Sequence, residues 1–293
     1  MGYLFLACAL LAGVTKGYCG KRTSGLITGF SDAVLTNLLR IGLCIFIGFA
    51  VVCFEGNLQQ LAPSGKLLWI SALSGVSTAA FVATWLICVR KSAYMLMDVF
   101  LTLGMLIPLL LSNLLFDEKI RLQQWLGMGI LLIAVLILCS YNNSIKEKLK
   151  PASLLLLIFC GAVSGTADFS QKLFVRQMPE TAASVFNFYT YIFAAIALTV
   201  WYLCIRQKTA PEITVYRKVA GYVAVMAACL FANSFFKTLA AEHLDAILLY
   251  PLNQGAALIL STLMSSVCFR EKITVKCICG IVIAFAGLLV INL

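Results

Sequence analysis

Apolar residues gather into long runs along the chain, separated by short polar breaks. A bilayer core about 30 Å thick is crossed by a helix of about 20 apolar residues, and the runs are close to that length. The pattern therefore predicts ten transmembrane helices. We place them near residues 3–20, 33–54, 67–89, 93–116, 122–141, 152–174, 184–205, 217–240, 244–268 and 273–292. Because these ranges use most of the chain, we expect an all-α integral membrane protein without an appended globular domain.

One short sequence occurs twice, each time just before a final apolar run. Phe116-Asp117-Glu118-Lys119-Ile120 in the first copy corresponds to Phe269-Arg270-Glu271-Lys272-Ile273 in the second. Two pairs of small residues match at the same offset, Gly127 with Gly280 and Ala134 with Gly287. An internal repeat with a period of about half the chain predicts two homologous halves.

The polar segment 142–151 is the natural boundary between these halves, because it is charged and ends in proline. It separates a first five-helix repeat, residues 1–141, from a second, residues 152–293. An odd number of helices per half makes the second half enter the membrane from the opposite side, so we expect the two repeats to be inverted. Many secondary transporters use inverted repeats to alternate between two states around a site near the midplane.

Composition supports a membrane location. Hydrophobic residues make up 62% of the chain and charged residues 12%, whereas soluble domains are roughly half apolar and a quarter charged. The net charge of +10 lies mainly in alternate loops, where the positive-inside rule explains it. We therefore expect a multi-pass protein of the cell membrane, plasma or bacterial inner, with both termini outside and no nucleic-acid partner. The twelve cysteines lie mostly singly within apolar runs, which favours packing over a metal site, and we expect no cofactor.

Six ionisable side chains lie within the predicted helices, where each costs roughly 2.5 to 3.5 kcal/mol at a helix centre. They are Lys16, Arg40, Asp98, Asp168, Lys172 and Lys237. Following the alternation of helices, the first three fall toward the cytoplasmic face and the last three toward the opposite face. We interpret them as two charge networks that close the two ends of a central cavity in turn. Snorkelling of the bases and a local Asp168–Lys172 pair four residues apart are the alternatives.

Several uncharged polar residues also lie within apolar runs. They are Asn37, Asn187, Tyr189, Asn233, Tyr250, Asn253 and Gln254. A polar group without a partner costs several kcal/mol in lipid, so each is expected to bond to another helix or to a solute. Asn37 and Asn187 correspond between the halves at a slightly different offset. Pro251 frees a backbone carbonyl and can bend its helix at the site, and Pro108 can do the same in the fourth predicted helix.

The Glu-Lys-Ile turn, with glycine eight or nine residues later in a last apolar helix, resembles the drug/metabolite transporter superfamily of the EamA type. Tyr250-Pro251-Leu252 is similar to the proline signature of that family's ninth helix, although the first half has Met97-Asp98-Val99 at the matching position. The resemblance covers essentially the whole chain. It implies an inner-membrane carrier of a metabolite or drug, with a central cavity lined mainly by helices 1 to 4 and 6 to 9.

Together these patterns predict a secondary carrier that moves a small polar or amphipathic metabolite by alternating access, with proton or exchange coupling. Four bases against two acids within the helices favour an anionic or zwitterionic solute, such as an amino acid or an organic anion. A multidrug or cation exporter of the same fold and a non-transporting scaffold or sensor are the alternatives. The chain has neither an ATP-binding motif nor a clustered His and Asp constellation, so we do not expect an enzyme. The repeated small residues favour close helix packing, within a monomer or across a homodimer.

Overall fold

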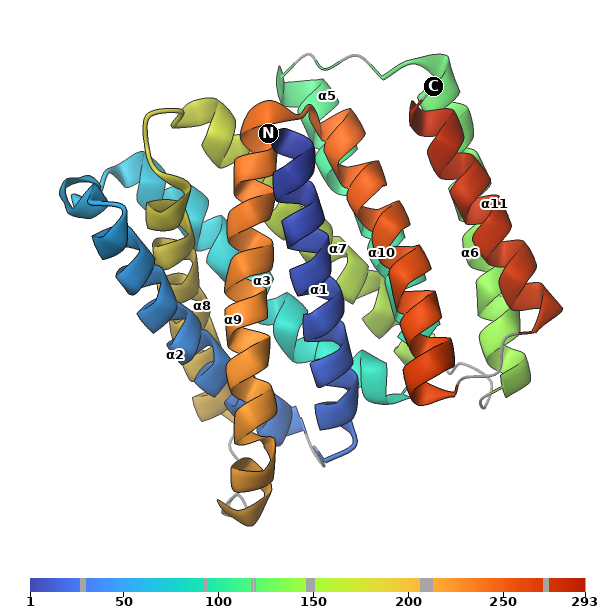
Figure 1. The fold of residues 1–293 in the computed structure, drawn as a ribbon, viewed down its shortest axis with the longest axis horizontal. Helices are drawn as coiled ribbons and strands as arrows, with labels where there is room; N and C mark the ends of the chain where they lie inside the picture. Colours follow the sequence, from blue (N-terminus) through green and yellow to red (C-terminus); the bar gives the residue numbers. More distant parts are fainter. Residues whose placement is uncertain are drawn as a thin grey trace. The chain divides into compact units, whose positions relative to one another are not determined.

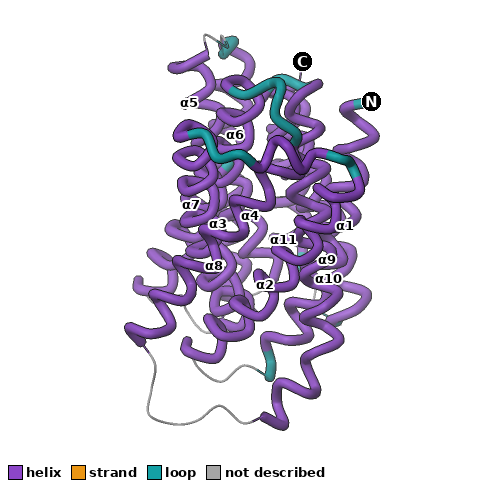
Figure 2. The backbone as a smooth tube through the Cα atoms, turned by 90° about the vertical axis from the view of Figure 1, so that its left-hand side faces the viewer, coloured by secondary structure: helices purple, strands orange, loops and turns teal. Residues whose placement is uncertain are grey.

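The computed structural model describes residues 1–26, 30–91, 94–116, 118, 120–145, 151–205, 213–270 and 274–292. Within these residues the secondary structure is helical and contains no strand (Figure 2). The elements, labelled in Figure 1, are α1 (Gly2–Ser24), α2 (Phe30–Phe54), the 3₁₀-helix η1 (Asn57–Leu61), α3 (Gly65–Lys91), α4 (Tyr94–Gly104), α5 (Leu106–Phe116), α6 (Leu122–Ile145), α7 (Pro151–Gln177), α8 (Ala183–Ile205), α9 (Ile213–His243), α10 (Ala246–Phe269) and α11 (Val275–Asn292).

Seven of these helices are long and apolar enough to cross a membrane, namely α1, α2, α3, α7, α8, α9 and α10. Shorter apolar helices occupy Phe100–Phe116, Leu122–Ala134 and Ile278–Ile291. The expected all-α membrane protein is thereby confirmed.

The stretch 93–116, predicted as one helix, is divided into α4 and α5 at Met105. Pro108 explains the position of the break, because a proline ring clashes with the carbonyl four residues earlier, here that of Gly104. Pro108 lies in the first turn of α5, where a missing N–H costs little. Pro251 has a different effect, since α10 continues through it from Ala246 to Phe269.

The chain forms two compact units, and each unit takes segments from both sequence halves. Unit 1 contains Met1–Ile87 and Ser170–His243, and unit 2 contains Cys88–Phe169 and Leu244–Leu293. The long helices α3 and α7 each contribute to both units. The two compact units therefore do not coincide with the two sequence halves that the predicted boundary at 142–151 separates.

In unit 1, α1 lies along α9, and α2 packs on α8 and α9 (Figure 1). The core between α2, α3, α8 and α9 contains small and branched side chains around two aromatic ones. Its buried members include Val34, Ile41, Ala79, Val82, Tyr191, Leu198, Leu230 and Phe231. Gly75 lets α3 approach α8, because a Cβ at this position would lie 2.6 Å from Cβ of Phe193. A side chain at Gly75 would force the two helices apart.

In unit 2, α6 lies along α11 (Figure 1), and α10 packs on α4 and α11. Gly127 of α6 faces Gly287 of α11, and a Cβ at Gly127 would lie 2.6 Å from the Gly287 carbonyl oxygen. Two of the four repeated small residues, Gly127 and Gly287, thus pack against each other within one chain. On α7, Gly161 and Gly165 are four residues apart and face the C-terminal end of α4. A Cβ at Gly165 would clash with the Gly104 carbonyl oxygen.

Candidate functional site

Arg40 is one of the largest buried side chains in the protein, with 2% of its surface exposed. It lies on α2 beside the apolar core of unit 1 and interacts electrostatically with Tyr191 of α8 and with Cys44, one turn further along α2. Within the described part of the chain, no acceptor lies within hydrogen-bonding distance of its Nε. Such burial is incompatible with a side chain that snorkels to water, so that alternative is wrong for Arg40.

Lys16 of α1 belongs to the same region of unit 1. Its Nζ lies 5.8 Å from the centroid of the Phe81 ring, in a cation–π contact. Lys16 and Arg40 both interact electrostatically with the Cys44 thiol, which donates a hydrogen bond to the Ala227 carbonyl at 3.3 Å. Two bases of the first predicted network therefore belong to unit 1. The third member, Asp98, lies on α4 in unit 2.

Asn37 and Asn187 make the same local hydrogen bond in their respective halves. Nδ2 of Asn37 donates to the carbonyl of Ala33 at 2.8 Å, and Nδ2 of Asn187 donates to the carbonyl of Ala183 at 2.8 Å. Each amide also bonds to the next helix of its half, Asn37 to the Val82 carbonyl at 2.9 Å and Asn187 to the Thr238 hydroxyl at 3.4 Å. The two asparagines thus share a bonding pattern, and their equivalence within a repeat stays a prediction.

The oxygen atoms of these two amides have different surroundings. Oδ1 of Asn187 accepts a hydrogen bond from Ser234 at 2.6 Å, and Ser234 in turn accepts one from Nε2 of Gln171 at 3.1 Å. Oδ1 of Asn37 is buried and receives no hydrogen bond within the described residues. Sequence reasoning singled out neither Ser234 nor Gln171, although it listed other uncharged polar residues within apolar runs. Their position inside apolar runs could have added them to the polar candidates, but it does not show that they pair with Asn187.

Lys172 and Lys237 of the second predicted network are both buried in unit 1. Nζ of Lys172 lies 3.5 Å from the Ala241 carbonyl, so it bonds to α9 instead of reaching solvent. Asp168, the remaining member, is in unit 2. Each predicted network combines residues of both units, so alternate closure by these charges stays a prediction.

Two of the predicted polar residues bond to the backbone of neighbouring elements in unit 1. Asn233 of α9 donates to the Ala9 carbonyl of α1 at 2.7 Å, and the Tyr189 hydroxyl donates to the Leu61 carbonyl of η1 at 2.6 Å. In this conformation both residues therefore join helices, which is the structural alternative to direct solute contact.

The polar residues of α10 are buried in unit 2. The Tyr250 hydroxyl donates to the backbone carbonyl of Asp168 on α7 at 2.7 Å. Asn253 and Gln254 follow on the next turn of α10 and are also buried. Tyr250 is therefore a helix-joining residue in this conformation.

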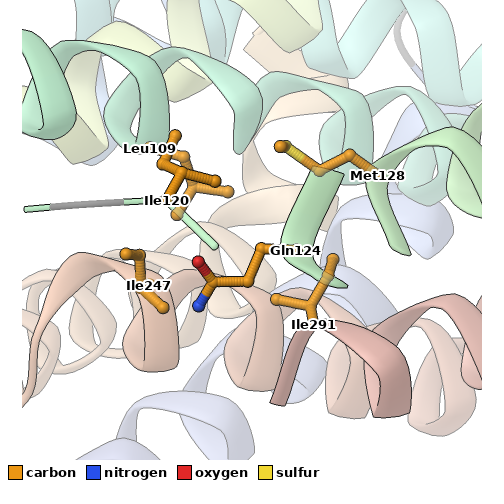
Figure 3. Close-up of a pocket in the computed structure, with 6 residues that line it drawn as sticks. All are labelled: Leu109, Ile120, Gln124, Met128, Ile247 and Ile291. Carbon is orange, nitrogen blue, oxygen red and sulfur yellow. The ribbon is translucent and has the colours of Figure 1, made fainter. Parts of the chain in front are cut away.

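Unit 2 also contains a small pocket between α5, α6, α10 and α11, and none of the predicted site residues lines it. Figure 3 shows its lining, Leu109, Ile120, Gln124, Met128, Ile247 and Ile291. The pocket has room for about one water molecule, and Oε1 of its one amide side chain, Gln124, already accepts the Arg121 N–H at 2.7 Å. It is too small for a solute. The second copy of the repeated turn, residues 271–273, lies outside the described residues, as do residues 146–150 of the predicted boundary.

Three comparisons relate the chain to known proteins. The model of the EamA-like transporter family matches residues 151–293. The probable 4-amino-4-deoxy-L-arabinose-phosphoundecaprenol flippase subunit ArnE of Hamiltonella defensa subsp. Acyrthosiphon pisum (strain 5AT) is 31% identical over 103 residues, which cover 33% of this chain and 92% of that protein. A crystal structure of another protein superposes with a TM-score of 0.71 at 16% identity, over 99% of this chain and 95% of that chain. This last likeness concerns the fold alone.

Proposed function

Because the chain belongs to the EamA-like transporters of the drug/metabolite transporter superfamily, we propose that it is a secondary carrier for a small polar or amphipathic metabolite that is anionic or zwitterionic. The carrier works by alternating access and is driven by protons or by exchange. In this proposal, residues 1–141 and 152–293 form two inverted five-helix repeats, with α4 and α5 together making one of the ten membrane spans.

The second half gives the repeat its clearest support. The family model matches residues 151–293, which nearly coincide with the proposed second repeat. Asn37 and Asn187 add a structural parallel, since each bonds back to an alanine carbonyl one turn earlier and across to the next helix of its half. With five spans per half, equivalent helices run in opposite directions, which is the arrangement that supports two interconvertible states.

The observation that carries the proposed solute class is the buried Arg40. A cation in a low-dielectric interior is costly unless it is paired and hydrogen-bonded, and intramembrane ionisable residues mark solute or ion pathways by default. The guanidinium presents several N–H donors in a planar fork that matches a carboxylate or a phosphate. An anionic group of the solute would compensate the charge of Arg40.

A lipid-linked anion is a second candidate solute. The ArnE relative is named as a subunit of a flippase for an aminoarabinose carried on phosphoundecaprenol, which combines an anionic group with a long hydrocarbon tail. Unit 1 has an open apolar groove between α3 and α8 that would suit such a tail. The groove is lined by Val76, Phe193, Ile196, Ala197, Val200, Trp201 and Cys204.

Counterflow in proteoliposomes tests the proposal. The purified full chain is reconstituted, loaded with one unlabelled solute at a time, and assayed for uptake of trace labelled L-glutamate, L-phenylalanine, glucose 6-phosphate or tetraphenylphosphonium. We expect saturable uptake of at least one solute with an anionic group. Replacing Arg40 by Ala is expected to remove that uptake. Lys66→Ala serves as the matched control and should retain it, because Lys66 is exposed and its ammonium group donates to the Gln177 carbonyl at 3.4 Å.

The other outcomes separate the alternatives. Uptake of tetraphenylphosphonium alone, insensitive to Arg40→Ala, would identify a cation exporter and contradict the anionic preference. Movement of a fluorescent phospholipid-linked sugar analogue between leaflets, without uptake of any soluble probe, would favour the lipid-linked candidate. No flux of any probe would favour the scaffold or sensor. Uptake that depends on an imposed pH gradient would distinguish proton coupling from exchange.

A further inference from the structure

The amide of Asn37 has a fixed orientation in the core of unit 1. Both of its N–H groups donate to backbone carbonyls, of Ala33 at 2.8 Å and of Val82 at 2.9 Å. A carbonyl oxygen can only accept a hydrogen bond, so the nitrogen must face these two carbonyls and the oxygen must face away from them. None of the surface of Asn37 is exposed, and within the described residues no donor reaches its Oδ1.

The second half shows what completes such an amide. Asn187 makes the same bond to the carbonyl one turn earlier, and its Oδ1 accepts the hydroxyl hydrogen of Ser234 at 2.6 Å. The acceptor of Asn187 is therefore satisfied by a side chain of α9. In the first half, Oδ1 of Asn37 has no such partner in the described structure. The two sites are otherwise similar and differ in whether this oxygen accepts a hydrogen bond.

Arg40 follows Asn37 by three residues on α2, so the two side chains lie on neighbouring positions of one helix face. Among the described residues, the Arg40 Nε is a buried donor without an acceptor and the Asn37 Oδ1 is a buried acceptor without a donor. The two atoms therefore do not satisfy each other. Leaving both unpaired disfavours this arrangement unless a ligand completes it in the transport cycle. A ligand that completes both must offer an anionic acceptor and a hydrogen-bond donor a few ångströms apart.

We propose that Asn37 and Arg40 form one binding subsite for an anion whose acidic group stands next to an N–H or O–H donor. An α-amino acid or a 2-hydroxy acid has this arrangement, because the carboxylate and the ammonium or hydroxyl group are attached to the same carbon atom. Arg40 takes the carboxylate and Asn37 Oδ1 accepts the hydrogen bond from the ammonium or hydroxyl group. The inference rests on the proposed function and narrows the solute class of that function to anions that carry their own donor.

The test uses pairs of solutes that differ only in the donor group. Binding of L-phenylalanine is compared with 3-phenylpropionate, and binding of L-glutamate and of 2-hydroxyglutarate with glutarate, by calorimetry on the purified full chain in nanodiscs. For at least one pair, the wild-type protein is expected to bind the donor-bearing member on the order of tenfold more tightly, because the member without a donor leaves the buried acceptor unpaired. Asn37→Leu should reduce this ratio to about threefold or less, without abolishing binding of the member without a donor.

Asn187→Leu is the matched control. It removes the equivalent amide and the equivalent bond to the preceding turn, but its oxygen is already paired with Ser234. The ratio should therefore stay near the wild-type value. If Asn37→Leu does not fold, Asn37→Ser provides a smaller perturbation and is judged by the same ratio.

Equal binding of both members of every pair by the wild-type protein overturns the inference, as does an unchanged ratio in Asn37→Leu. In either case, anion binding that is lost in Arg40→Ala would still support the proposed function. If no anion of either kind binds, the proposed solute class and this subsite fall together.

Discussion

The two glycines of α6 provide a sharp test of the packing in unit 2. Gly127 and Gly129 are two residues apart on one helix, and the same substitution by alanine should have opposite effects on stability. At Gly127 the added Cβ would lie 2.6 Å from both the Gly287 carbonyl oxygen and Cγ1 of Ile291. At Gly129 a Cβ would meet no heavy atom within 4 Å.

The expected magnitudes follow from two terms. Alanine is favoured over glycine within a helix by about 1 kcal/mol, and this gain applies at both positions. At Gly127 the added Cβ would lie several tenths of an ångström too close to the backbone of α11. The helices α6 and α11 must therefore separate, and overpacking of this kind costs about 1 to 3 kcal/mol. The helix-propensity term cancels between the two variants. Their free energies of unfolding should therefore differ by about 1 to 3 kcal/mol, with Gly129→Ala the more stable.

Reversible unfolding in mixed micelles, followed by intrinsic tryptophan fluorescence, measures this difference. The wild-type protein and both variants are titrated under one set of conditions, and the comparison is between the variants. Equal stability of the two variants within about 0.5 kcal/mol would contradict the α6–α11 packing described above. A lower stability of Gly129→Ala would also contradict it.

Three further predictions concern the site and the topology. Replacing Arg40 by Met should raise thermal stability and remove the uptake of anions. Exchange of a buried ion for an apolar side chain is often neutral or stabilising by about 1 to 4 kcal/mol. Lower stability together with intact uptake would refute this prediction. Asn187→Leu should lower the free energy of unfolding by about 1 to 3 kcal/mol, since the Ser234 hydroxyl loses its acceptor. If both termini lie outside, as predicted, a membrane-impermeant maleimide added to intact cells should label the exposed Cys53 and leave the exposed Cys204 unlabelled. The reverse labelling pattern would show that the protein has the opposite orientation.

Much of the helical architecture could be predicted from the sequence. The predicted spans 3–20 and 184–205 correspond to α1 and α8, because about 20 consecutive apolar residues can satisfy their backbone in lipid only as a helix. The sequence also predicted that Asn37 corresponds to Asn187, and each of these amides bonds to the carbonyl one turn earlier. The break at Met105 was not predicted, although Pro108 was identified as a residue that can bend its helix.

The candidate site was only partly predictable. Buried charge at Arg40 could be anticipated from its position in an apolar run, but whether it snorkels depends on how closely α8 and α9 cover it. Ser234 was passed over because nothing in its local sequence shows that it faces Asn187, 47 residues away in the chain.

The sequence by itself determined that this is a helical membrane protein with a repeated pattern and with costly charges inside its helices, because hydropathy and periodicity are local properties of the chain. Only the tertiary structure decided which polar atoms are paired. Asn37 and Asn187 look alike in sequence, yet one amide oxygen meets a serine and the other meets none in the described structure. That difference arises from contacts between helices that are distant along the chain, and hydrogen bonding depends on distances of a few ångströms that no local pattern specifies.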